Sequence, residues 1–110
     1  MENSITDLVK NKPQLFCFYV DHSGSTHLMH PVLTDLQEDY KHHLNFHFYG
    51  KGEKENLEKI FDIYFFPTLL IVWKKEIIYR FHGLISRDFL YDSINELLSM
   101  VRGDFSKNNN

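Results

Sequence analysis

The sequence has one cysteine, Cys17, and lacks both an excess of positive charge and long apolar runs. A single thiol cannot form an intramolecular disulfide, which excludes a disulfide-stapled fold. The 12 lysines and arginines are outnumbered by 15 aspartates and glutamates, so the chain offers no general nucleic-acid surface. No apolar run approaches the roughly 18 residues of a membrane helix, and the first residues lack the basic and apolar parts of a signal peptide. We therefore expect a cytoplasmic protein with no nucleic-acid or membrane partner.

Alanine is also absent, whereas the chain contains ten phenylalanines and six tyrosines. The core is therefore expected to consist largely of large, flat side chains. A chain of 110 residues fits one domain, which we expect to act as a monomer. Because Gly103 is expected to end the last helix, the domain is predicted to span residues 1–103, with residues 104–110 as a flexible polar tail.

Hydrophobic periodicity predicts helices and strands that alternate along most of the chain. The helix predicted over 25–41 provides a crossover that makes the first two strands parallel, whereas the tight turn at Lys74–Glu76 makes the last two antiparallel. The sequence therefore predicts an α/β fold with a mixed four-stranded sheet flanked by helices on both faces. The predicted elements are helix 4–11, strand 15–20, helix 25–41, strand 44–49, helix 53–61, a strand within 64–73, strand 77–81 and a helix from 86 to 103.

For two of the predicted helices, the sequence also indicates which residues face the core or cap the helix. The helix over 53–61 is expected to turn Leu57, Ile60 and Phe61 toward the core. Ser86 precedes the last apolar stripe and is expected to cap that helix at its N-terminus.

The loop between the first strand and the following helix is the first place to look for chemistry. It contains Asp21, His22, Ser23 and Gly24, a cluster of turn-forming residues. In α/β folds the carboxyl ends of the strands usually carry the functional site. The free N–H groups at the start of the next helix also favour an anion or a thiolate.

The segment from Phe18 to Thr26, followed by Pro31, resembles the thioredoxin family. In that family an apolar strand leads into a Cys-X-X-Cys motif that opens a helix, and a proline lies five residues after the second cysteine. Here the two cysteine positions are occupied by Ser23 and Thr26. The family commonly has a buried acidic residue six positions before the first cysteine, where this chain has Cys17. The resemblance implies a thioredoxin-like fold in which the redox positions are degenerate.

Two later segments extend this resemblance over nearly the whole chain. Phe66-Pro67-Thr68 is similar to the family's Ile-Pro-Thr signature, in which the proline is cis and faces the motif loop. The pair at 82–83 matches the family's last groove segment. The resemblance implies a peptide-binding groove with one or two exposed aromatic residues among Tyr64, Phe65 and Phe66. Its implied lining residues are His22, Ser23, Gly24, Phe66, Pro67, Thr68, His82 and Gly83.

Thiol–disulfide chemistry requires a thiolate, which neither Ser23 nor Thr26 can provide. Cys17 lies in the middle of an apolar strand and is expected to be buried and unreactive. The sequence therefore predicts a redox-inactive protein, without a cofactor, that binds a protein or an extended peptide through the groove. A groove without any ligand and a thioredoxin-type oxidoreductase with weak single-thiol activity are the alternatives.

The histidines near the loop suggest two further chemistries. Ser23 as a hydrolytic nucleophile would need an adjacent base, but the loop lacks the second glycine of a nucleophile elbow. One of Ser23, Ser25 and Thr26 is better explained as a helix cap. A histidine-based metal site would combine His27 and His30, one turn apart, with His22 and His82. No carboxylate or cysteine spacing completes such a site, so we predict no metal ligands and keep metal binding as an alternative.

Overall fold

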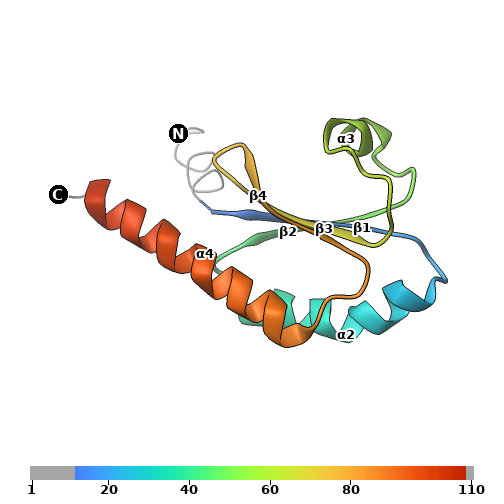
Figure 1. The fold of residues 1–110 in the computed structure, drawn as a ribbon, viewed down its shortest axis with the longest axis horizontal. Coiled ribbons are helices and arrows are strands. Elements are labelled where there is room, and N and C mark those ends of the chain that lie inside the picture. Colours follow the sequence, from blue (N-terminus) through green and yellow to red (C-terminus); the bar gives the residue numbers. More distant parts are fainter. Residues whose placement is uncertain (1–11, 109–110) are drawn as a thin grey trace.

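The computed structural model describes residues 12–108, with side chains over residues 12–102 (Figure 1). The helix predicted over 4–11 therefore lies outside the described residues. The remaining predicted elements are all present, with ends that differ by one to a few residues. They are β1 (Gln14–Tyr19), α2 (Gly24–Asp39), β2 (Asn45–Gly50), α3 (Glu55–Ile60), β3 (Thr68–Trp73), β4 (Glu76–His82) and α4 (Arg87–Asn108).

The four strands form one mixed sheet in the order β2-β1-β3-β4. β1 pairs parallel with β2 and antiparallel with β3, and β3 pairs antiparallel with β4. Figure 1 shows α2 and α4 on one face of the sheet and α3 on the other. The predicted α/β fold, with helices on both faces of a four-stranded sheet, is confirmed.

The core has two parts, one on each face of the sheet. Alternation along β1 turns Leu15 and Cys17 toward α2 and α4, where they join the larger cluster of buried residues. Phe18 lies in the smaller cluster on the opposite face, which α3 and the loop after it cover. The buried side chains that α2 and α4 contribute to the larger cluster are Met29, Leu36, Leu90, Ile94 and Leu97.

The predicted inward face of α3 is wrong at one position. Leu57 and Phe61 pack against the smaller cluster, but Ile60 is 70% exposed. The helix has only six residues, so a small rotation decides which of two neighbouring apolar residues reaches the sheet.

The predicted end of the last helix is also wrong. The helix α4 continues through Gly103 to Asn108, so the backbone over residues 104–108 is helical, where a flexible tail was predicted. A glycine ends a helix by adopting a left-handed conformation, but it can also be accommodated inside one at a cost of about 1 kcal/mol. The start of α4 agrees with the prediction, because the Ser86 hydroxyl accepts a hydrogen bond of 3.2 Å from the Phe89 N–H.

A tight hairpin joins β3, which begins near the β1–α2 loop, to β4, which ends near the same loop. Lys74 and Lys75 have φ values of 53° and 67°, the left-handed pair expected of a two-residue hairpin turn. The resulting register places Thr68, at the start of β3, opposite His82, at the end of β4. Over the described residues, no helix has the length and apolar character needed to cross a membrane.

Candidate functional site

The loop between β1 and α2 is held by its own hydroxyl groups. Ser23 is the N-cap of α2, and its Oγ accepts a hydrogen bond of 3.0 Å from the Thr26 N–H. The Ser23 hydroxyl also donates to Thr26 Oγ1 at 2.8 Å. The preceding residue, His22, has a φ of 66°, which turns the chain from the strand into the helix. The two positions that match the family's cysteines therefore touch each other, as two hydroxyl groups.

This geometry gives no support to Ser23 as a nucleophile. Its proton is already donated to Thr26, and among the described residues no hydrogen bond joins the Ser23 hydroxyl to a histidine side chain. A serine hydroxyl needs an adjacent base to become nucleophilic at neutral pH. The observed contacts are those of a helix cap, and they select Ser23 from the three cap residues that the sequence suggests.

The segment around Pro67 lies beside the end of β4. The Phe66–Pro67 peptide bond is cis, as the resemblance implies. The Pro67 carbonyl accepts a hydrogen bond of 2.8 Å from the N–H of Gly83, which has a φ of 75°. A left-handed φ of this kind favours glycine at position 83. The prolyl segment and the glycine segment are thus joined directly.

The side chains of Thr68 and His82 define a second link between these segments. The Thr68 hydroxyl donates its one hydrogen to the Phe65 carbonyl. Its Oγ1 also lies 3.3 Å from His82 Nδ1, and it can only accept in that contact. With the Thr68 hydrogen given to the Phe65 carbonyl, Nδ1 of His82 is the donor in this contact.

The aromatic residues before Pro67 differ strongly in exposure. Tyr64 and Phe65 are 76% and 62% exposed, and the Phe65 ring meets His82 edge-on at a centroid distance of 5.2 Å. Phe66 is half-buried and packs on the smaller core cluster. The Lys51 ammonium, which sequence reasoning did not assign to the site, lies 5.5 Å from the centroid of the Phe66 ring. We call Tyr64 and Phe65 the exposed aromatic pair.

Three separated segments therefore meet at one end of the sheet. Thr26 and Pro67 line the same cavity, and the Pro67 carbonyl accepts a hydrogen bond from the Gly83 N–H. The β1–α2 loop, the start of β3 and the end of β4 lie together on the right of Figure 1, away from the C-terminal half of α4. Gly24 is the first residue of α2, and the space beside its Cα is empty, since a Cβ placed on it would meet nothing within 4 Å. His22, Ser23 and Gly24 border a shallow depression beside the same cavity.

The histidines do not form a recognisable metal centre. His22, His27 and His30 all border the depression next to the loop. However, no group of three or more histidine, cysteine, aspartate or glutamate side chains among the described residues could hold a metal ion. The alternative of a histidine-based metal site therefore gains no support from the geometry.

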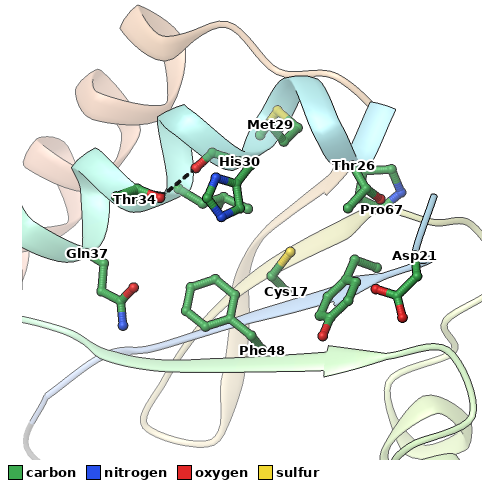
Figure 2. Close-up of a pocket in the computed structure, with 11 residues that line it drawn as sticks. Cys17, Asp21, Thr26, Met29, His30, Thr34, Gln37, Phe48 and Pro67 are labelled. Atoms are coloured by element: carbon green, nitrogen blue, oxygen red, sulfur yellow. Dashed lines mark hydrogen bonds between the residues drawn. The ribbon is translucent and has the colours of Figure 1, made fainter. Parts of the chain in front are cut away.

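The one thiol lies behind the loop and is sequestered from solvent. Cys17 is 1% exposed and points from β1 toward α2 (Figure 2). Burial raises the pKa of the Cys17 thiol from 9.0 to about 12, because an apolar environment disfavours the thiolate. The predicted burial of Cys17 is confirmed, and at neutral pH its sulfur is a protonated, poorly nucleophilic group.

Comparison with known proteins identifies the same family as the sequence motifs. The family model for thioredoxin matches residues 2–96. The germline-specific thioredoxin Deadhead of Drosophila melanogaster aligns with a TM-score of 0.73 and 16% identity, over 87% of this chain and 90% of that one. Mitochondrial thioredoxin 3 of Saccharomyces cerevisiae aligns with a TM-score of 0.68 and 21% identity, over 86% and 89% of the two chains. A comparison with curated proteins finds no significant match. At these identities the solved structures show a shared fold.

Proposed function

Because this chain belongs to the thioredoxin family, we propose that it is a redox-inactive member that binds an extended segment of a partner protein beside Pro67. Two independent sets of contacts support the two halves of this proposal. One concerns the missing thiolate, and the other concerns the free backbone and exposed aromatic surface next to the proline.

The redox half rests on the residues at the motif positions. Ser23 and Thr26 are hydroxyl residues that bond to each other and to the helix start, and neither ionises near neutral pH. Cys17, with a pKa of about 12, would be a thiolate in only about one molecule in 10⁵ at pH 7. A weak single-thiol activity of Cys17 therefore has neither an accessible sulfur nor a reactive form to act through.

The binding half rests on the backbone of Phe66, which is the single observation that carries the proposal. Among the hydrogen bonds of the described residues, none uses the N–H or the C=O of Phe66. Its neighbours Tyr64 and Phe65 expose large aromatic surfaces to solvent. Free backbone groups beside exposed apolar side chains are the features with which proteins bind an extended strand. The backbone supplies affinity, and the aromatic pair supplies side-chain contacts.

The test begins with peptides selected for binding from a random library displayed on phage, followed by titration calorimetry. We expect selected peptides to bind the wild type and to lose about tenfold or more in affinity with the double variant Tyr64→Ser, Phe65→Ser. Met100→Ser is the matched control, because Met100 is also an exposed apolar side chain, 53% accessible, but lies on the far part of α4. Equal affinities for the double variant and the wild type, or a library that yields no binder, would contradict the proposal.

A further inference from the structure

The cavity that Thr26 and Pro67 border extends between α2 and the sheet, behind the β1–α2 loop. Its volume is about 390 Å³, within the range of small-molecule sites. Cys17 and Phe48 rise into it from β1 and β2, and Met29 and Leu33 face it from α2. Figure 2 shows the cavity as a slot between the helix and the edge of the sheet, with Cys17 and Phe48 on the sheet side. The sheet side of the cavity is therefore apolar.

Polar groups lie at the two ends of this slot and on its helix side, where the His30 imidazole points from α2 toward the sheet (Figure 2). Gln37 lies at one end and Asp21 at the other, next to Pro67 (Figure 2). The Thr34 hydroxyl is already engaged, since it donates 2.9 Å to the His30 carbonyl within α2. A ligand would thus meet apolar side chains on the sheet side, the His30 imidazole on the helix side and a carboxylate at one end.

Asp21 is exposed, and it is the only carboxylate among the described residues that line the cavity. Burial, together with the negative charge of Asp21, raises the pKa of the neighbouring Tyr19, so that phenol stays neutral. Cys17 is also uncharged, because burial raises its pKa. An anionic ligand would be repelled at the Asp21 end, and a cationic group would be attracted there.

We propose that this cavity binds a small aromatic amine, with its ring between Phe48 and the α2 side chains Met29 and Leu33 and its ammonium group toward Asp21. Aromatic rings pack favourably on phenylalanine and against the methionine sulfur. A charge-assisted hydrogen bond from the ammonium to the carboxylate fixes the orientation. This site uses neither Tyr64 nor Phe65, although it shares Pro67 with the peptide site proposed above.

Three probes with the same ring and different charges test the proposal: tryptamine, 3-methylindole and indole-3-acetate. Each is titrated into the ¹⁵N-labelled full chain, and the amide resonances of β1, β2 and α2 are followed by NMR. We expect tryptamine to bind with an affinity about tenfold or more above that of indole-3-acetate, and 3-methylindole to lie between them. An equal or stronger affinity for the anion, or no binding by any probe at millimolar concentration, would overturn the proposal.

Two variants localise the binding. Asp21→Asn should remove the preference for tryptamine over 3-methylindole while both still bind, and because Asp21 is exposed this change leaves the core intact. Leu33→Trp should fill the slot and abolish binding of all three probes. Glu38→Gln, which neutralises an exposed carboxylate on α2 outside the cavity, is the control and should change nothing. An unchanged charge preference in Asp21→Asn would refute the assigned orientation, whether or not Leu33→Trp folds.

Discussion

At the scale of single residues, the molecule retains the contact geometry of a redox motif without its sulfur chemistry. The hydroxyl oxygens of Ser23 and Thr26 lie 2.8 Å apart, at the two positions where the family has cysteines. The thiol that does exist, Cys17, lies on the buried face of β1. In the function proposed here, the thiol chemistry is absent because hydroxyl groups occupy both positions, while the loop keeps the two side chains in contact.

The short contact between Ser23 and Thr26 predicts that the double variant Ser23→Cys, Thr26→Cys forms a disulfide. Side-chain atoms at 2.8 Å need to approach only slightly to reach the S–S bond length of about 2.05 Å. Under mild oxidation we expect mass spectrometry to show the loss of two hydrogens, with Cys17 remaining reduced. Ser23→Cys alone is the control and should show no intramolecular bond. Persistence of all three thiols in the double variant would show that the loop cannot bring the two sulfurs together.

The burial of Cys17 predicts that its thiol does not react in the folded protein. A thiol-specific reagent such as an alkylating maleimide should leave native protein unlabelled over hours, because labelling requires a local or global opening. In denaturant, labelling should be complete within minutes. Stoichiometric labelling without denaturant would reopen the possibility of single-thiol chemistry.

His47 predicts a dependence of stability on pH. Its ring stacks on Phe16 at a centroid distance of 4.6 Å and bonds to Gln14 Oε1 at 2.7 Å. Burial lowers the pKa of His47 from 6.5, so below pH 6.5 the unfolded chain binds a proton more readily than the folded one. Acidification through this range should therefore lower the free energy of unfolding.

This effect can be measured by urea unfolding at pH 7.5 and at pH 5 for the wild type and His47→Phe, a variant that keeps an aromatic ring on Phe16. The wild type should lose more stability than the variant on acidification. An equal loss in both proteins would show that His47 does not contribute to the acid sensitivity.

At the scale of the elements, the hydrophobic pattern predicts strands better than helix faces and ends. The strands were predictable because apolar runs bounded by turn residues have few alternatives, and Lys74–Glu76 marks the hairpin clearly. Ile60 was predicted to face the core but is exposed, because in a short helix neighbouring apolar residues compete for one inward face. The end of α4 was predicted from Gly103 alone, and glycine is compatible both with the end of a helix and with a position inside it.

The continuous course of α4 predicts that Gly103→Ala stabilises the protein. Within a helix, alanine is favoured over glycine by up to about 1 kcal/mol, and somewhat less is expected near a helix end. Circular dichroism should show an increased helical signal, and the urea midpoint should rise slightly. A lower midpoint would mean that position 103 requires a conformation that alanine avoids. Ser99→Ala, at an exposed position in the same helix, provides a comparison.

At the scale of the whole molecule, the candidate site depends on three segments that only the fold brings together. The sequence motifs allowed their residues to be anticipated, because each motif has a fixed place in the family. The sequence did not indicate that Tyr64 and Phe65, rather than Phe66, are the exposed residues. Their exposure depends on how Phe66 packs on the smaller core cluster and beneath Lys51. The cavity behind the loop could not be predicted either, because it arises from the spacing between α2 and the sheet edge.

The central claim is that an extended peptide pairs with the free backbone beside Pro67. The most direct measurement is hydrogen exchange at the Phe66 amide, followed by NMR with and without a saturating selected peptide. The account predicts that exchange at this amide slows by about tenfold or more when the peptide binds, because its N–H gains a partner it lacks in the free protein. Peptide binding that leaves exchange at Phe66 unchanged would place the ligand elsewhere and contradict the account.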